Sequence, residues 1–388
     1  MALDNGVIYL DHSATTPTRP EVVARMLPYF GELFGNPSSI YTLGRKSLDA
    51  IDSAHEAVAR ALNCRPTEIV FTGGGSEADN LAIKGIAYAQ RRRGDHIITT
   101  AIEHHAVLRT CERLEQEGYR VTYLPVDEYG RVTPEQVEAA ITDQTALVTI
   151  MYANNEIGTV QPIAEIGRIC RERRVPFHTD AVQAGGQIEL DVAALQVDML
   201  SLSAHKFYGP KGVGLLYVRQ GTRVQPQTLG GSQERNRRAG TENVPGVVGA
   251  AYALELARSE RERENARLQA LRDQLIAGML ALPDVRLTGH PTERLPQHAS
   301  FTVAGVEGES LLLNLDLVGI AASSGSACAT GDIEPSHVLS AMGIPASAAR
   351  GALRLTLGHS ITEEDIATTL QRMGEILPRL RALSTQPA

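Results

Sequence analysis

The feature that most constrains the fold is a regular alternation of short β-rich runs and helical stretches between Glu68 and Val218. Apolar residues at helical spacing occupy intervening segments such as 81–92 and 163–173. This alternation predicts an α/β fold whose large domain has a mostly parallel, seven-stranded sheet covered by helices. In such sheets ligands collect at the carboxyl ends of the strands. The predicted strands are 69–72, 96–100, 121–125, 146–152, 176–180, 198–203 and 213–218.

The pattern changes after Thr241, where a long helical stretch over 244–282 has a strongly charged middle. We expect this stretch to connect two domains, because 388 residues that are 43% hydrophobic exceed what one core usually organises. The segments beyond it predict a smaller α+β domain. Its strands are expected at 285–288, 299–303, 320–323 and 352–357, and its helices at 308–317, 335–342 and 362–383. The predicted division assigns 15–255 to the large domain, and 1–14 with 256–388 to the small one.

Charge and composition exclude several classes of protein. The formal net charge is −8 and the arginine runs are short, which argues against a nucleic-acid partner. No apolar run approaches the roughly 18 residues that span a bilayer, and the first residues lack the features of a signal peptide, so a cytoplasmic location away from membranes is expected. The cysteines form no CxxC pair, which argues against a disulfide framework and a structural zinc site. They are Cys64, Cys111, Cys170 and Cys328.

The densest chemical signal is the segment 201–212, in which a predicted strand runs into a loop that carries Lys206 after Ser203 and His205. A lysine that forms a Schiff base must be held rigidly beside its cofactor, and the end of a strand can do this. For this segment alone, an ordinary exposed lysine in a surface turn remains an alternative.

The neighbouring predicted strand ends at Asp180, whose carboxylate could pair with a protonated pyridine nitrogen and keep the ring an electron sink. In isolation, such an aspartate is more often a helix cap or a metal ligand. The glycine-rich turn 72–80 follows another strand and offers backbone N–H groups and Ser76 to a phosphate. No Gly-Lys-Ser/Thr follows this turn, so binding of a nucleoside triphosphate is disfavoured.

Two further strands lead to His104 and Asn155. A histidine ring can stack on a pyridine face, and an asparagine amide can donate a hydrogen bond to a phenolate oxygen. Either residue alone is more often structural. Suitable polar groups at four strand ends together predict a pyridoxal-phosphate enzyme with the cofactor on Lys206.

Motifs spread over nearly the whole chain resemble the class V aminotransferase-like cysteine desulfurases, and within them the NifS/IscS-like group. They include Leu10-Asp-His-Ser-Ala-Thr-Thr-Pro17, Phe34-Gly-Asn-Pro37, the glycine-rich turn, Glu103-His104, Asn154-Asn155-Glu156, the Asp180 and Lys206 segments, Arg238-Ala-Gly-Thr241, Ser323-Ser-Gly-Ser-Ala-Cys328 and Ala352-Leu-Arg354-Leu. The resemblance implies the type I fold of pyridoxal-phosphate-dependent transferases and a homodimer.

The resemblance also implies roles for individual residues. Lys206 carries the cofactor, His104 stacks on its ring and Asp180 pairs with its nitrogen. Asn155 and Gln183 lie near the phenolate oxygen of the cofactor. Its phosphate is bound by Gly75, Ser76, Ser203 and His205, and by Thr241 from the partner subunit. The substrate carboxylate is bound by Arg354, assisted by Asn36 and Asn155. A planar guanidinium suits that last role, because it binds a carboxylate with two parallel hydrogen bonds.

Cys328 matches the sulfur-accepting nucleophile of the family. Small residues surround it from Ala321 to Gly331, which predicts a segment that moves easily. The implied reaction takes sulfur from L-cysteine, gives L-alanine and leaves a persulfide on Cys328, with His104 as a candidate for proton transfer. An acceptor protein, either an iron–sulfur scaffold or a thiolation enzyme, then takes the sulfur. The alternatives are a selenocysteine lyase or an aminotransferase of the same fold, and a catalytically silent sulfur-trafficking protein.

The chain departs from the family pattern in a few places. Ser76 stands where threonine is common, His12 lies where other residues are usual, and Asp332 introduces an acid shortly after Cys328. The chain stops at Ala388 without the longer C-terminal tail that IscS-like members use with their scaffold partner. The resemblance therefore leaves the acceptor open.

Overall fold

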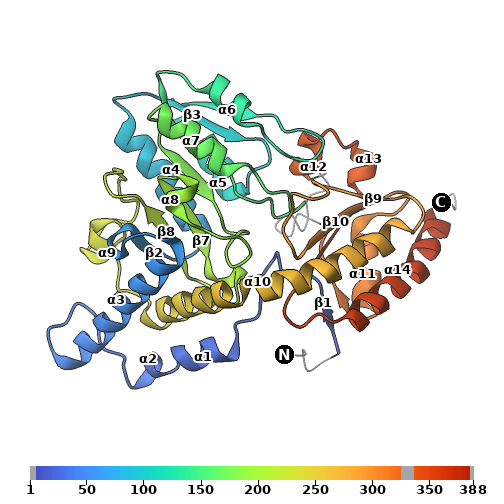
Figure 1. Cartoon of the computed structure of the whole chain (residues 1–388), viewed down its shortest axis with the longest axis horizontal. Helices are drawn as coiled ribbons and strands as arrows, with labels where there is room; N and C mark the ends of the chain where they lie inside the picture. The colour runs from blue at the N-terminus through green and yellow to red at the C-terminus, as the bar shows by residue number, and fades with distance from the viewer. Residues whose placement is uncertain (1–5, 325–335, 385–388) are drawn as a thin grey trace.

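The computed structural model describes residues 6–324 and 336–384, which form two units joined by one long helix, α10 (Figure 1). The large unit contains a seven-stranded sheet with the strand order β2-β8-β7-β6-β5-β3-β4. All neighbouring strands are parallel except β8, which runs antiparallel to both β2 and β7. The strands are β2 (Ile69–Thr72), β3 (His96–Thr100), β4 (Arg120–Leu124), β5 (Thr145–Thr149), β6 (Phe177–Asp180), β7 (Met199–Ser203) and β8 (Gly214–Val218). The predicted fold class is confirmed.

Both faces of this sheet are covered by helices, and the alternation of side chains along each strand explains why. Ile97 contacts one apolar cluster with α4 (Gly75–Gln90) and α5 (His105–Gln116), whereas its neighbour Ile98 belongs to the cluster on the other face. That second cluster includes α3 (Thr42–Leu62), α7 (Ile163–Glu172) and the first part of α10. Every residue of β3, β5, β6, β7 and β8 is buried, as expected for strands that are covered on both faces.

The second unit has its own apolar core. Its antiparallel sheet has the order β12-β10-β9, and a separate parallel pair joins β1 to β11. Its core contains Leu10 together with side chains from residues 268 to 380. Its elements are β1 (Ile8–Tyr9), β9 (Val285–Leu287), β10 (His298–Val303), α11 (Gly308–Asp316), β11 (Ile320–Ala321), α12 (His337–Ala341), α13 (Ala346–Ala349), β12 (Ala352–Thr356) and α14 (Glu363–Ser384).

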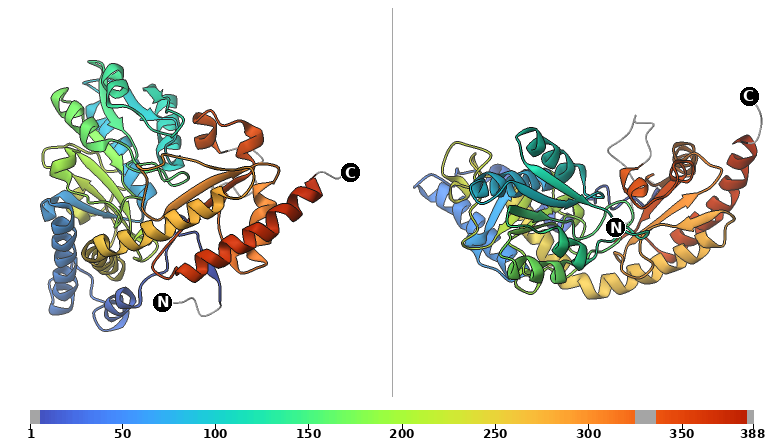
Figure 2. Two further views of the ribbon diagram at one scale, coloured as in Figure 1. Left: turned by 45° about the vertical axis from the view of Figure 1, so that its right-hand side comes forward. Right: turned by 90° about the horizontal axis from the view of Figure 1, so that it is seen from above.

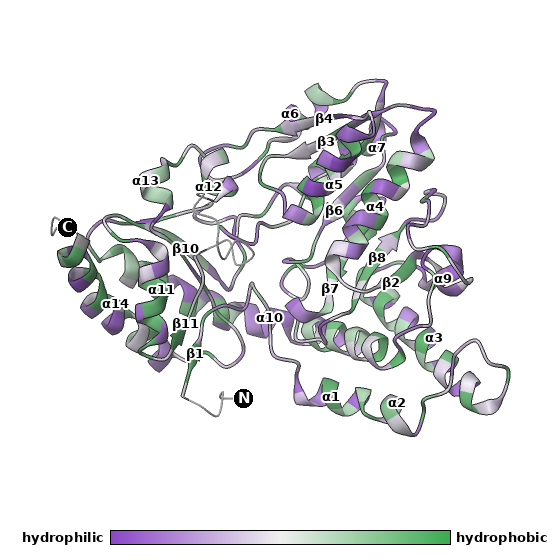
Figure 3. Ribbon diagram, turned by 180° about the vertical axis from the view of Figure 1, so that it is seen from behind, coloured by the Kyte–Doolittle hydropathy of each residue, from purple (hydrophilic) through white to green (hydrophobic). Residues whose placement is uncertain are grey.

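Helix α10 runs without interruption from Val244 to Leu280 and lies along both units (Figure 2). Its first turns pack into the large core and its last turns into the second core, while the stretch between them is mostly charged and partly exposed (Figure 3). The division predicted between residues 255 and 256 falls inside this helix and stays a prediction.

The remaining short elements belong to the large unit. They are α1 (Pro20–Met26), α2 (Pro28–Gly31), the 3₁₀ turn Pro66–Glu68, α6 (Pro134–Ala140), α8 (Val192–Leu195), the 3₁₀ turn Ala204–Lys206 and α9 (Gln233–Asn236). Among the described residues, no helix is both long enough and apolar enough to cross a membrane.

Candidate active site

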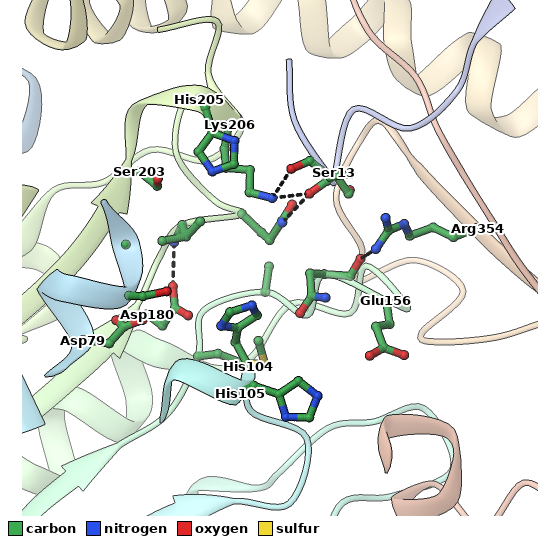
Figure 4. Close-up of a pocket in the computed structure, with 18 of the residues that line it drawn as sticks. Ser13, Asp79, His104, His105, Glu156, Asp180, Ser203, His205, Lys206 and Arg354 are labelled. Carbon is green, nitrogen blue, oxygen red and sulfur yellow. Dashed lines mark hydrogen bonds between the residues drawn. The ribbon is translucent and has the colours of Figure 1, made fainter. Parts of the chain in front are cut away.

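A cavity of about 290 Å³ lies where the carboxyl ends of the parallel strands face the second unit. Side chains that follow β3, β5, β6 and β7 point into it, as Figure 4 shows. The sequence-predicted residues that line it are Gly75, Ser76, His104, Asn155, Asp180, Gln183, Ser203, His205, Lys206 and Arg354. The expectation that polar groups at several strand ends converge on one site is therefore met.

Lys206 lies in the 3₁₀ turn directly after β7 and reaches across to the N-terminal segment. Its Nζ donates hydrogen bonds to the backbone carbonyl of Ser13 and, at 2.8 Å, to that of Ala14. These contacts orient the amine at the cavity (Figure 4). A primary amine held this way is suited to covalent attachment of an aldehyde cofactor.

Asp180 is the last residue of β6, the strand next to β7, so it and Lys206 stand on adjacent strand ends as predicted. Its Oδ1 accepts a hydrogen bond from Val182 N at 2.9 Å. Burial raises the pKa of Asp180 to about 6, while the Val182 N–H and the positive charge of Lys206 act in the opposite direction. A buried carboxylate of this kind pairs strongly with a cationic ring nitrogen.

His104 caps the N-terminus of α5, and its Nδ1 accepts a hydrogen bond from Ala106 N at 3.1 Å. Burial, and next the charge of Lys206, lower the pKa of His104 to about 4. The neutral ring therefore carries its proton on Nε2, since Nδ1 is the acceptor.

The opposite end of the cavity is built around the first turn of α4. The helix begins at Gly75, and Gly74 before it provides no side-chain cap, so the first N–H groups remain available to an anion. A Cβ at Gly75 would lie 2.8 Å from Val182 Cγ2 and 3.4 Å from Ser203 Cβ, so a side chain would fill this space. His205 lies nearby, and its Nδ1 is 3.1 Å from Thr15 Oγ1.

Arg354 enters from β12 of the second unit and is almost fully buried. Its Nη1 donates to the backbone carbonyl of Asn155 at 2.9 Å, and its Nη2 donates to Asp11 Oδ1 at 2.8 Å. Gln183 joins the same region, because its Nε2 donates to Ser13 O at 3.0 Å. The second unit thus supplies a guanidinium to a cavity whose other walls belong mostly to the large unit.

Three predicted residues are not among those lining the cavity. Asn36 is exposed in the segment between α2 and α3, where its Oδ1 accepts a hydrogen bond from Ser38 N. Thr241 is exposed just before α10. Cys328 lies outside the described residues, and so does Asp332.

The structure adds cavity residues to which the sequence gave no role: Ser13, Ala14, Asp79, His105, Glu156 and His337. Ser13 and Ala14 belong to the quoted Leu10–Pro17 motif, which was the available signal. Asp79 lies one helical turn after Gly75, a spacing that places both on one face of α4. Nothing in the sequence near His337 indicated its position.

This donor set fits pyridoxal phosphate. The cavity offers an amine, a buried carboxylate for the ring nitrogen, and a glycine-flanked helix start for the phosphate. In addition, Ser13 Oγ is buried and has no hydrogen-bond partner among the described residues. Fold and cavity together define a pyridoxal-phosphate-dependent transferase.

Comparison with known proteins agrees with this definition. Residues 8–368 match the Aminotransferase class-V family. A relative described as cysteine desulfurase IscS, from Methanosarcina thermophila, is 55% identical over 99% of this chain and 95% of its own length. A solved structure described as a NifS-like protein superimposes with a TM-score of 0.91 at 38% identity, covering 96% of this chain and 100% of the other. Another, titled SspA in complex with cysteine, has a TM-score of 0.80 at 37% identity and covers 90% and 98%.

The chain belongs to the class-V aminotransferase family, and within it to the NifS/IscS-like cysteine desulfurases. It is a pyridoxal-phosphate-dependent enzyme that acts on cysteine.

Proposed function

We propose that Lys206, Asp180 and Arg354 divide the work of cysteine desulfuration, with Lys206 holding the cofactor, Asp180 pairing with its ring nitrogen and Arg354 binding the substrate carboxylate. The observation that carries this proposal is the convergence of the three side chains on one cavity from β7, β6 and β12. His104 would lie against the ring, Gln183 and Asn155 near its phenolate oxygen, and Gly75, Ser76, Ser203 and His205 at its phosphate.

When bound, pyridoxal phosphate supplies an electron sink for the electron pair left at the substrate Cα. Lys206 Nζ would hold the cofactor and serve as the base for the α-proton of the substrate, and the carbonyls of Ser13 and Ala14 hold it beside the cavity. Arg354 orients L-cysteine through its carboxylate. The protonated Nε2 of His104 is a donor within the same cavity and is assigned to proton transfer.

The proposed sulfur acceptor is Cys328. Its thiolate attacks the sulfur of L-cysteine, an S–S bond forms as the substrate C–S bond breaks, and the electron pair of that bond goes to the carbon skeleton. Protonation releases L-alanine and leaves a persulfide on Cys328.

The other cysteines support this assignment by their positions. Cys64, Cys111 and Cys170 do not line the cavity, and Cys111 and Cys170 are fully buried. Burial raises the pKa of Cys64 to about 12 and also raises the pKa values of Cys111 and Cys170. Because the thiolate is the nucleophile, these groups are poor sulfur acceptors.

The segment that carries Cys328 is flanked by residues close to the cavity. On one side Ser323 exchanges backbone hydrogen bonds with Arg354, and on the other side His337 lines the cavity itself. We further propose that the persulfide serves an acceptor protein for iron–sulfur cluster assembly or tRNA thiolation, in a cytoplasmic homodimer whose Thr241 reaches the partner's phosphate site.

The test compares Cys328→Ser with Cys64→Ser as a matched control. With L-cysteine and a reductant, Cys328→Ser is expected to lose sulfide release while the visible absorbance of the cofactor persists, and Cys64→Ser to behave as the unmodified enzyme. Unchanged sulfide release in Cys328→Ser would refute the assignment. Sedimentation tests the homodimer, since a fully active monomer contradicts the role of Thr241.

A further inference from the structure

A second carboxyl group, that of Asp79, lies next to Asp180 in the cavity wall (Figure 4). Asp79 is on α4, one turn after Gly75, and only 1% of its surface is exposed. Its Oδ1 has no hydrogen-bond partner among the described residues. A buried carboxylate oxygen without a hydrogen-bond partner is costly, so the protonation state of this group needs an explanation.

The basic side chain beside Asp79 does not explain a negative charge on it. This side chain is His178, whose Nε2 is 3.7 Å from Asp79 Oδ1. Both nitrogens of this fully buried ring are already bonded to hydroxyls, at 2.8 Å from Thr149 Oγ1 and 2.9 Å from Ser201 Oγ. Burial lowers the pKa of His178 to about 3, so the ring is neutral.

The remaining groups that face Asp79 are acidic. Glu103, after β3, is fully buried and accepts hydrogen bonds from Thr100 Oγ1 and Met151 N, and burial raises its pKa to about 8. Of these two acidic groups, Asp180 has the larger effect on the pKa of Asp79. Burial and then the charge of Asp180 raise the pKa of Asp79 well above its usual value, and a hydrogen bond from Ser201 acts in the opposite direction.

The two neighbouring aspartates differ in what stabilises their charge. Asp180 has the N–H of Val182 and the positive charge of Lys206, whereas Asp79 has neither. Adjacent carboxyls in a dry site do not both ionise readily, and the proton goes to the one with less support.

We propose that Asp79 is a positioning residue for the cofactor, present as a neutral carboxylic acid whose O–H stabilises the carboxylate of Asp180 and leaves the single negative charge there. This rests on the proposed role of Asp180. A protonated carboxyl group can donate a hydrogen bond through its O–H, whereas a carboxylate can only accept one. With Asp79 protonated, Asp180 faces the ring nitrogen without a competing charge behind it.

The direct test is isotope-edited infrared spectroscopy of the holoenzyme labelled with ¹³C-carboxyl aspartate. At neutral pH we expect a protonated-carboxyl band that disappears in Asp79→Asn. The matched control is Asp198→Asn, because Asp198 is also buried but lies at the start of β7 and accepts from Phe177 N. It should keep the band. Absence of the band, or its persistence in Asp79→Asn, overturns the proposal.

A second test measures cofactor retention after apoenzyme is titrated with pyridoxal phosphate. Asp79→Asn keeps a neutral donor and should bind the cofactor within a few-fold of the unmodified enzyme, whereas Asp79→Ala should bind it about tenfold more weakly or worse. Thermal unfolding identifies any variant that fails to fold, and the infrared result then decides.

The variant Asp180→Asn separates a failure of the role proposed for Asp180 from a failure of the role proposed for Asp79. If it retains the cofactor normally, the assignment of Asp180 fails and the role of Asp79 fails with it. If it loses the cofactor while Asp79→Asn and Asp79→Ala bind equally well, only the role of Asp79 is overturned.

Discussion

Replacing Arg354 by lysine tests whether one side chain both binds the substrate carboxylate and stabilises the contact between the two units. Arg354 is only 2% exposed and donates to Asn155 O and Asp11 Oδ1 from two different nitrogens. A lysine keeps the charge but cannot present the same fork. Loss of one such charged hydrogen bond should lower the free energy of unfolding by about 1.5–3 kcal/mol. Loss of a similar bond to the substrate carboxylate should raise KM for L-cysteine roughly 10- to 100-fold.

The assay measures kcat and KM for alanine formation together with urea unfolding. Arg272→Lys is the matched control, because Arg272 is equally buried in the second unit, donates to Asp273 and to Leu295 O, and does not line the cavity. The control should lose stability and keep its KM. Equal KM values in the two variants would refute the assignment of Arg354 as the substrate clamp.

Three further predictions concern buried residues of the large unit. Gly75→Val should weaken binding of pyridoxal phosphate at least about tenfold in apoenzyme titrations, because its Cβ would meet Val182 Cγ2 at 2.8 Å; binding equal to that of the unmodified enzyme would contradict the helix-start site. Glu234→Gln should lower the free energy of unfolding by about 3 kcal/mol in urea titrations, since it breaks a buried pair with His55 at 3.1 Å. A change below about 1 kcal/mol, the value of an exposed pair, would show that the pair contributes little to stability. The pKa of His178 is lowered to about 3 when folded, so the unfolded state binds more protons than the folded state between about pH 6.5 and that value. The unmodified enzyme should therefore lose about 1.4 kcal/mol per pH unit relative to His178→Asn as the pH falls from 6.5 to 4, and parallel stability curves would contradict this.

The strands of the large sheet were predictable because short β-rich runs alternate with segments of helical spacing. The bounds of β2 and β3 agree with the prediction, whereas β5 ends at Thr149 and not at residue 152. The start of α4 was misplaced: apolar periodicity suggested residue 81, but the helix begins at Gly75. Val182 and Ser203 lie so close to Gly75 that a Cβ there would meet them, and the local sequence does not reveal this proximity.

The site was predictable where residues follow strands, as with Asp180 and Lys206. It was less predictable where burial comes from another element. Asp79 is a polar residue inside a helix, which normally indicates a solvated face, but α4 packs against the sheet and Asp79 is buried. The carbonyl anchors of Lys206 come from Ser13 and Ala14, far away in the sequence, so spacing alone could not identify them.

The contacts of the N-terminal segment also constrain when the enzyme can assemble during synthesis. Its first strand pairs with β11, and His12 Nδ1 lies 3.0 Å from Thr356 O, 344 positions further along the chain. A nascent chain on the ribosome emerges from the N-terminus onward, so this segment is made first, whereas its partners in β11 and β12 are made last. Arg354 can therefore reach Asp11 only when nearly the whole polypeptide has been translated, and the wall that β12 contributes to the cavity is completed late.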